Sequence, residues 1–242
     1  MALQSATGIL TAPAVDVRAS NRLLAALPAT DYARLAPELR LISLHAKQTL
    51  QRQDEPIENV YFLDQGACSV VRVMTDGQMA EIASVGNEGA IGASAFLGHS
   101  HAMGDTRVYP SGARGRAMNR IAFLAEMGRR GPFYDLIIHY SQALTAELMR
   151  AAVCNALHLT EERCCRWLLL TSDRLQADEF PVTHEFIAAM LGVRRPTITL
   201  IVRALQQTHA IESRRGLLRI TDRERLLGMA CECYKPARDV EE

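Results

Sequence analysis

The twenty residues from His184 to Arg203, HEFIAAMLGVRRPTITLIVR, set packing residues and cations in a fixed order. Ile187 and Leu191 are spaced to share the buried face of one helix, and Ala188 is small enough for a second helix to cross closely. Gly192 supplies the backbone freedom that a tight turn needs. This order is typical of a helix-turn-helix, whose second helix enters the major groove of DNA. The exposed polar side chains of such a motif form hydrogen bonds to base edges and to phosphates.

The side chains left outside this packing are the candidate DNA contacts. Arg195 is the best candidate for reading a base, because a guanidinium pairs bidentately with guanine. Arg194, Arg203 and Thr183 are expected to touch phosphates, and Thr183 is also placed to cap the first helix. Apolar and basic residues alternate around Arg215-Gly216, which predicts a hairpin. Its arginines either contact DNA or are merely solvated. The complete predicted set is Thr183, Arg194, Arg195, Thr197, Thr199, Leu200, Arg203, Arg214 and Arg215.

Charge is distributed unevenly along the chain. The formal net charge of the 242 residues is +0, and the hydrophobic content of 48% is that of an ordinary globular protein. The segment from Pro181 to Ile220 has six arginines, no lysine and two acids, which gives it +4 and leaves −4 for the rest. This asymmetry indicates a DNA-binding end attached to a separate module.

The histidines and cysteines show no local metal-binding spacing, and we expect neither a metal nor a cofactor. No two cysteines form a C-x-x-C pair. Cys164-Cys165, beside Trp167, are expected to be buried structural thiols rather than a redox switch. Cys231-Glu-Cys233 is exposed by position and could sense an oxidant. His99-Ser-His101 lacks a third ligand, so solvated loop histidines are the better interpretation.

No catalytic motif stands out, and the chain is not expected to be an enzyme. The stretch from Gly92 to Phe96 contains Ser94 but lacks the final glycine of a nucleophile elbow. Gly86, Gly89 and Gly92 recur every three residues, which matches neither a dinucleotide-binding nor a phosphate-binding fingerprint. Turns and bulges of a β domain explain these glycines more simply.

Residues from about Leu41 to Met118 read as many short strands. Stretches in which apolar and polar residues alternate, or which are rich in β-branched residues, are separated by turn signals. Asp76-Gly77 between two such stretches is the clearest hairpin. A spacing of roughly 8–12 residues predicts an antiparallel sandwich or barrel. Ahead of it, residues 21–40 suggest short helices, the first capped by Asn21 and the second by Thr30 or Asp31.

A long helix is predicted from about Phe133 to Leu157, opened by Pro132. Its stripe is compatible with a dimer-forming helix and equally with a helix that covers only the core of its own domain. Thr160 starts another helix that ends near Leu175, and an extended link then leads to Thr183. The predicted dimer stripe comprises Ile137, Tyr140, Leu144, Leu148 and Ala151.

A β segment, a long helix and a winged reader, in that order, resemble the Crp/Fnr family of bacterial transcription regulators. The resemblance covers roughly residues 20–230. Its most specific part is THEFIAAMLGVRRPTITLIVRALQQTHAIE, followed by NVYFLDQGACSVV and DGQMAEIASVGNEGAIG between Asn59 and Gly92. It implies a homodimer joined by the long helix, a β-roll that senses an effector, double-stranded DNA with two-fold related half-sites as target, and RNA polymerase as a partner.

The β-roll departs from the pattern of relatives that bind cyclic AMP. In those relatives a Glu after the signature Gly holds the ribose, and a later Arg pairs with the phosphate. Here Ala93 follows Gly92, and Asp105 aligns with the Arg, so a carboxylate would repel the phosphate. Cyclic AMP is therefore not the expected effector, whose identity stays open. No cysteine precedes Cys68, which argues against the iron–sulfur mode of other relatives. The predicted effector pocket comprises Gly92, Ala93, Ser94, Asp105 and Thr106.

The reader departs from the family pattern as well. Arg195 matches the base-reading Arg, but Pro196 replaces the Glu that accepts from cytosine and Leu200 replaces a second Arg. Leu200 offers only apolar contact, for example to a thymine methyl. The target sequence should therefore differ from the family's best-known site. The alternative function is an effector-binding or scaffold module whose winged domain contacts protein instead of DNA.

The predicted fold is α+β, with an N-terminal antiparallel β-roll of jelly-roll type and a C-terminal winged helix-turn-helix. The expected divisions are a flexible N-terminus (1–20), the β-roll sensor (21–131), the dimerisation helix (132–158) and the winged DNA-binding domain (159–242). No run of 18 apolar residues and no secretory signal is visible, so a cytoplasmic protein with reduced thiols is expected.

Overall fold

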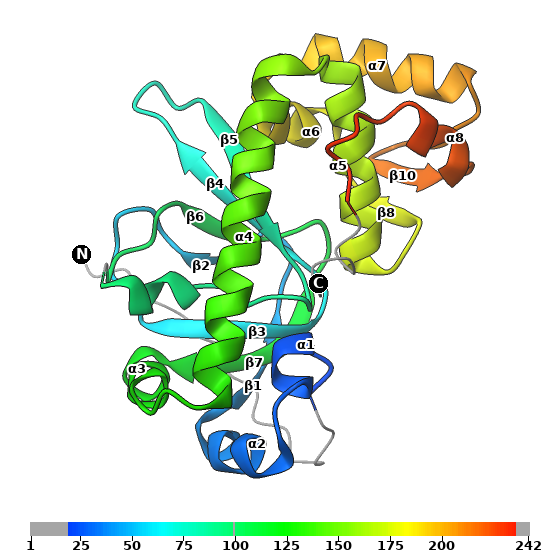
Figure 1. Ribbon diagram of the computed structural model, residues 1–242. Coiled ribbons are helices and arrows are strands. Elements are labelled where there is room, and N and C mark those ends of the chain that lie inside the picture. Colours follow the sequence, from blue (N-terminus) through cyan, green and yellow to red (C-terminus); the bar gives the residue numbers. More distant parts are fainter. Residues whose placement is uncertain (1–18, 99, 236–242) are drawn as a thin grey trace.

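The computed structural model describes residues 19–98 and 100–235 (Figure 1). An antiparallel β domain and a C-terminal helix-turn-helix domain are connected by one long helix, so the predicted α+β class is confirmed. Of the twenty N-terminal residues expected to be flexible, only Ala19 and Ser20 lie within the described part. Ala19 is buried in the core of the β domain, which corrects that expectation for this residue.

Short helices precede the β domain: α1 (Arg22–Ala25), α2 (Ala29–Leu35) and the 3-10 turn η1 (Ala36–Glu38). Asn21 caps α1 as predicted, because its side-chain oxygen accepts from the Leu24 N–H at 3.2 Å. Its amide also donates to the carbonyls of Leu63 and Gly89, which ties the helix to the β domain. The cap predicted for the second helix is wrong: the N-cap is Pro28, two residues before Thr30, and its ring holds φ at −52°.

Two antiparallel sheets form the β domain, one with strand order β1-β7-β3 and one with order β2-β6-β4-β5. The strands are β1 (Arg40–Leu44), β2 (Thr49–Gln51), β3 (Asn59–Gln65), β4 (Cys68–Val73), β5 (Met79–Val85), β6 (Asp105–Val108) and β7 (Ala113–Asn119). The predicted Asp76-Gly77 hairpin joins β4 to β5, with Gly77 at φ +83°. The 3-10 turn η2 (Ala93–Leu97) and helix α3 (Arg120–Gly128) complete the domain.

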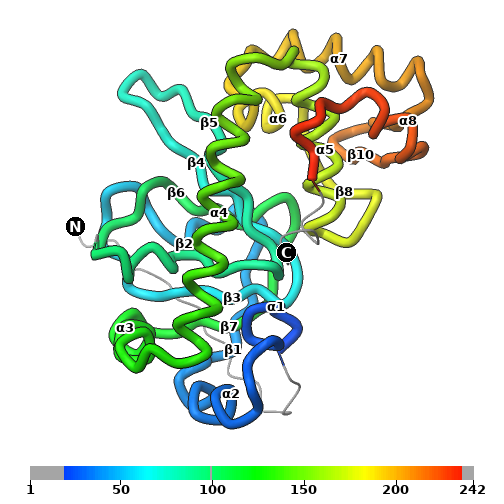
Figure 2. The backbone as a smooth tube through the Cα atoms, viewed as in Figure 1, coloured from blue at the N-terminus to red at the C-terminus, as the bar shows by residue number. Residues whose placement is uncertain are grey.

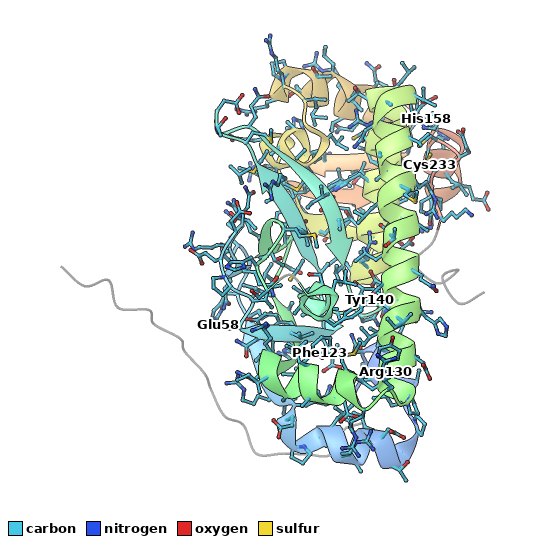
Figure 3. The ribbon with its side chains drawn as sticks, turned by 60° about the vertical axis from the view of Figure 1, so that its left-hand side comes forward. Glu58, Phe123, Arg130, Tyr140, His158 and Cys233 are labelled. Atoms are coloured by element: carbon cyan, nitrogen blue, oxygen red, sulfur yellow. The ribbon has the colours of Figure 1, made fainter. Side chains whose placement is uncertain are left out.

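Helix α4 (Pro132–Leu157) has two halves with different surroundings. Phe133 and Ile137 near its start are buried in the β-domain core, where Phe133 packs edge-on against Phe123 at 5.8 Å between ring centroids. Tyr140 packs over the same domain near Gly89 (Figure 3). Ile137 and Tyr140 thus cover their own chain, so their assignment to the dimer stripe is wrong.

The described part of the C-terminal domain packs four helices around a small sheet of order β8-β10-β9. Its elements are α5 (Thr160–Leu175), β8 (Glu179–Pro181), α6 (His184–Leu191), α7 (Arg195–Gln207), β9 (Ile211–Arg214), β10 (Leu217–Ile220) and α8 (Arg223–Gly228). The predicted start and end of α5 are confirmed. The extended link expected after α5 is a strand of this sheet, because it pairs with β10.

The two domains contact each other beside the β4–β5 hairpin, which lies next to α6 (Figure 2). The ring of Tyr109 stacks on Phe186 with 3.3 Å between centroids. The indole N–H of Trp167 donates to a Glu81 carboxylate oxygen at 2.7 Å. The helix-turn-helix domain is therefore fastened to the β domain through specific side chains. Among the described residues, no helix is long and apolar enough to cross a membrane.

Candidate nucleic-acid interface

The helix-turn-helix forms as the sequence predicts. Ile187, Ala188 and Leu191 are buried on α6, and Gly192 ends the helix in the left-handed region at φ +65°. The Val193 N–H bonds to the Ala188 carbonyl at 2.9 Å, which closes the turn. The left-handed conformation explains why glycine stands at this position.

Thr183 caps α6, because its hydroxyl oxygen accepts from the Phe186 N–H at 3.2 Å. The side chain is exposed, and its methyl lies near Gly216 at the tip of the β9–β10 hairpin. The Val182 N–H donates to the Gly216 carbonyl at 2.7 Å, which holds the hairpin against this end of α6. The fold thus brings two predicted phosphate contacts, the cap and the hairpin, to one place.

The N-terminal turn of α7 is an exposed cationic end. Arg194 is the N-cap, Arg195 is the first helical residue and Pro196 follows. Proline is accommodated because the first-turn N–H groups have no partner within the helix. Arg194, Arg195, Pro196 and Thr197 are all exposed. The positive end of the helix dipole and two guanidinium groups therefore face the same volume, which suits an anion.

The outer face of α7 continues this surface. Leu200 is 66% exposed and Arg203 is exposed one turn further on, as predicted. Thr199 differs from its prediction as an outward-pointing residue: it is half-buried, its hydroxyl donates to the Arg195 carbonyl at 3.1 Å, and its oxygen lies 3.1 Å from His184 Nδ1. Thr199 sits where α7 crosses the start of α6, so its hydroxyl is used inside the motif.

The imidazole of His184 favours its neutral form beside this cationic end. Burial lowers the pKa of its imidazole, and the positive charge of Arg195 lowers it further. A neutral His184 keeps a hydrogen-bonding nitrogen for Thr199 and adds no repulsion to Arg195.

The β9–β10 hairpin confirms the predicted wing. Arg215 and Gly216 form its tip with φ values of +50° and +81°, and Arg214 pairs with Leu217 across it. Both arginines are exposed. Within the described part of the chain, no carboxylate forms a salt bridge with any of the five predicted arginine contacts, which leaves these cations available to an external anion.

The predicted effector-pocket residues cluster only in part. Gly92 precedes η2 at φ +81°, and a side chain there would meet the Gln51 amide at 2.5 Å. Gln51 is paired with Thr106 across the β2–β6 ladder, so it lies between two predicted pocket residues, and sequence reasoning missed it. Ala93 and Thr106 are buried. Ala93 belongs to the domain core, which corrects its assignment as a pocket-lining residue.

Asp105 is held as a carboxylate within the β domain. One oxygen accepts from the Gln53 N–H at 2.9 Å and the other from Arg107 at 2.8 Å. Burial raises the pKa of this carboxyl, but these two hydrogen bonds together with the positive charges of Arg107 and Arg52 leave the pKa below its ordinary value. Asp105 is therefore a partnered negative charge, which supports the prediction that this position repels a phosphate.

The cysteines are more buried than their positions in the sequence suggest. Cys164 and Cys165 are buried as expected. Cys231 and Cys233 are only 5% and 8% exposed, so the expectation that this pair is exposed is wrong. They meet Cys154 and His158 at the end of α4, although spacing along the chain predicts no metal site. The missed signal is the one-turn spacing of Cys154 and His158. His99 lies outside the described residues.

Two family profiles match this architecture. The cyclic nucleotide-binding domain matches residues 41–109, and the Crp-like helix-turn-helix domain matches residues 162–229. The chain belongs to the Crp/Fnr family. It combines the sensor-type domain and the DNA-binding motif of the transcription regulators in this family.

Solved structures of Crp/Fnr regulators share the fold. A protein of Eubacterium rectale assigned to the family superposes with TM-score 0.69 at 15% identity, covering 87% of this chain and 98% of the other. The CRP-family regulator TTHB099 of Thermus thermophilus gives 0.67 at 17% identity, covering 81% and 99%. The c-di-GMP-responsive regulator CLP of Xanthomonas campestris gives 0.65 at 14%, covering 80% and 99%. No curated protein matches the chain in sequence.

Proposed function

We propose that this chain is a homodimeric, sequence-specific transcription regulator of the cytoplasm, which binds promoter DNA and acts on RNA polymerase there. One observation carries the proposal: exposed arginines, with no carboxylate partner among residues 19–98 and 100–235, gather on the start of α7, its outer face and the wing. Phosphate contacts from such cations position a protein on DNA, and base-edge contacts from the helix give specificity. The +4 charge of the segment from Pro181 to Ile220 adds attraction to the duplex.

The C-terminal half of α4 supports the dimer. Beyond Leu144 an apolar surface is exposed on the helix: Leu148, Met149, Val153 and Leu157. Met149, Val153 and Leu157 repeat at four-residue intervals and thus share one face. A second copy of α4 would cover this face. Ile137 and Tyr140 have no part in it, whereas Leu144, Leu148 and Ala151 keep their predicted place near the seam.

In this dimer each α7 would enter the major groove of one half-site, and the half-sites would lie about 34 Å apart. Arg195 is the proposed guanine reader, and Leu200 the proposed contact to a thymine methyl. Arg194, Arg203, Thr183 and the wing arginines are the proposed phosphate contacts. Thr197, exposed in the first turn, stays in the proposed set, whereas Thr199 contributes by holding α7 on His184.

The effector of the β domain is proposed to be something other than cyclic AMP. Ala93 is part of the core, and Asp105 is a partnered carboxylate where a phosphate would need a cation. Micromolar binding of cyclic AMP in a calorimetric titration would contradict this part of the proposal.

A protein-contacting winged module is the alternative function, and DNA selection separates the two. The full-length protein is incubated with a random duplex pool, with and without cell extract, and the bound DNA is sequenced. The regulator predicts enrichment of a two-fold related motif with half-sites about one helical turn apart. A pool that stays unenriched under both conditions would contradict DNA recognition, and enrichment only with extract would indicate an effector.

A further inference from the structure

Four metal-ligating side chains meet at the junction of α4 and α5. Cys154 lies in the last turn of α4, His158 ends that helix, and Cys231 and Cys233 come from the segment after α8. Their sulfur and imidazole nitrogen atoms all lie within 4.8 Å of one another. Figure 3 shows His158 and Cys233 together at this end of α4. The three cysteines form a small buried cluster of their own, separate from the apolar cores of both domains.

Two of the separations among these four atoms match edges of a tetrahedron around one ion, and all of them lie within 4.8 Å. Cys154 Sγ lies 3.5 Å from Cys231 Sγ, and Cys233 Sγ lies 3.5 Å from His158 Nδ1. Zinc bonds of about 2.3 Å to sulfur and about 2.0 Å to nitrogen place neighbouring ligand atoms about 3.5–3.8 Å apart in tetrahedral geometry. Three cysteines and one histidine are also a donor set that zinc uses in closed structural sites.

The surroundings of His158 orient it as a ligand. Its Nδ1 faces Cys233, while its Nε2 lies 3.1 Å from a carboxylate oxygen of Glu232. A carboxylate on the far nitrogen fixes the tautomer of a metal-bound histidine and strengthens it as a donor. Because Glu232 stands between Cys231 and Cys233, one short segment supplies two thiols and this carboxylate.

Charge at the cluster is partly compensated. Three thiolates, a neutral imidazole and a divalent ion carry a net charge of −1, and the Glu232 carboxylate at His158 adds another −1. Arg166 lies beside the cluster, where its Nε donates to the Cys233 carbonyl at 3.3 Å. Its positive charge offsets one of these two negative charges.

Other uses of these thiols fit the geometry less well. The Cys154 and Cys231 sulfurs are 3.5 Å apart, well beyond the roughly 2.05 Å of a disulfide. A catalytic zinc keeps an open position for water, whereas four protein ligands close this one. An iron–sulfur cluster needs room for several irons and sulfides, and ligand atoms this close surround one ion only.

The site's position gives it a structural task. Tyr234, next to Cys233, donates its hydroxyl hydrogen to Asp173 at 2.8 Å and accepts from Arg223, also at 2.8 Å. These bonds place the C-terminal segment along α5, while Cys154 and His158 belong to α4. An ion held by both would join the end of α4 to the DNA-binding domain.

We propose that Cys154, His158, Cys231 and Cys233 bind one zinc ion per chain and fasten the C-terminal segment to the junction between α4 and α5. The site is independent of the proposed DNA function, since it needs neither DNA nor an effector.

Metal content of untagged, full-length protein purified under reducing conditions tests the proposal. We expect about one zinc per chain in the wild type by plasma mass spectrometry, and at least a fivefold loss in the C231A/C233A variant. The matched control is Cys68→Ala, which removes a buried thiol in the β domain and should retain the zinc. Zinc-free wild type, or equal zinc in the double variant, would overturn the proposal, as would iron with sulfide in the wild type.

A cobalt titration keeps the test independent of how well the double variant folds. Wild-type protein is stripped with a chelator and titrated with Co²⁺. The expected spectrum has thiolate-to-cobalt charge-transfer bands and the strong visible bands of tetrahedral cobalt, which saturate at one equivalent and disappear on addition of zinc. Octahedral cobalt spectra, or no spectral change, would overturn the site.

Discussion

Arginines of this chain differ in role according to what surrounds them. Arg195 is exposed at the start of α7 with no carboxylate salt bridge among the described residues. The side chain of Arg174 is only 4% exposed, and its guanidinium bonds both Glu88 and Glu147. The sequence predicts the first, because helix-turn-helix periodicity decides which side chains face outward. It does not predict the second, because the two partners of Arg174 come from distant segments that only the fold brings together.

Arg195→Ala should weaken binding to the selected duplex by about 5- to 150-fold, equivalent to ~1–3 kcal/mol, and relax preference at one base-pair position. The loss follows from removing a bidentate base contact. Fluorescence anisotropy with duplexes mutated at each position measures both effects. Arg129→Ala is the control, because Arg129 is an exposed arginine in the β domain, far along the chain from α7. A uniform loss at every position would contradict base reading by Arg195.

Glu81 makes stability depend on pH. Its carboxyl is buried under Trp167, and this burial raises its pKa. Folding therefore favours the protonated form, so the contribution is fully present below the ordinary pKa of 4.5 and is lost as pH rises through the raised value. Glu81→Gln keeps an acceptor for the indole and removes the buried charge.

Urea denaturation between pH 4 and pH 8 checks this prediction for Glu81→Gln. The variant should unfold at higher urea than the wild type at pH 8, and the difference should shrink toward pH 4. Glu179→Gln, an exposed carboxyl of β8, should follow the wild type throughout. A variant less stable than the wild type at pH 8 would contradict the assignment of a buried charge to Glu81.

At the scale of elements, the sequence predicts α4 almost to the residue but not which partner each half contacts. Pro132 and the apolar repeat define the helix. Periodicity gives one stripe along its length, whereas Phe133 and Ile137 near its start are buried in the β-domain core and Met149, Val153 and Leu157 near its end are exposed. A helix that changes its packing partner midway keeps the same 3.6-residue repeat. The predicted dimer stripe therefore includes Ile137 and Tyr140, which pack on the chain's own β domain.

Val153→Glu should convert the dimer to a monomer, because the side chain is 53% exposed within one chain and would be buried against a second copy. Sedimentation equilibrium at micromolar concentration measures this as a fall from twice the 26.7 kDa chain mass to that mass. Ile121→Glu on α3, where the side chain is 76% exposed, should leave the dimer intact. A dimeric Val153→Glu variant would place the seam elsewhere.

At the scale of the whole molecule, long-range contacts decide what the sequence leaves open. Domain order, the hairpin at Gly77 and the wing at Gly216 follow from local patterns, and the structure confirms them. Local patterns do not predict the interface made by Tyr109, Phe186 and Trp167. They do not predict the contact of Cys154 with Cys231 either, because these two cysteines are 77 residues apart in the sequence. Such sites depend on how domains meet, and no local spacing encodes that.

Arg174 joins three elements and should be costly to remove. Its Nε lies 2.9 Å from Glu88 and one terminal nitrogen lies 2.8 Å from Glu147. Arg174→Met keeps the volume but leaves two carboxylates without their cation, so the free energy of unfolding should fall by about 3–5 kcal/mol. Urea denaturation at pH 7 measures it. Arg129→Met removes an exposed cation 3.7 Å from Glu126, which keeps its bond to Arg34, so the substitution should cost under about 1 kcal/mol. Equal losses in the two variants would contradict the role of Arg174 as a buried link.

The salt dependence of binding to the selected duplex tests the central claim most directly, because a surface of exposed arginines acts on DNA through phosphates. For six to ten phosphate contacts per dimer, affinity should fall about 10³- to 10⁵-fold between 50 and 200 mM salt. The R194A/R203A variant should bind more weakly and with a smaller slope of log affinity against log salt. The predicted result is a steep linear dependence that these two substitutions reduce. Binding that is insensitive to salt, or a slope unchanged in the double variant, would contradict the account.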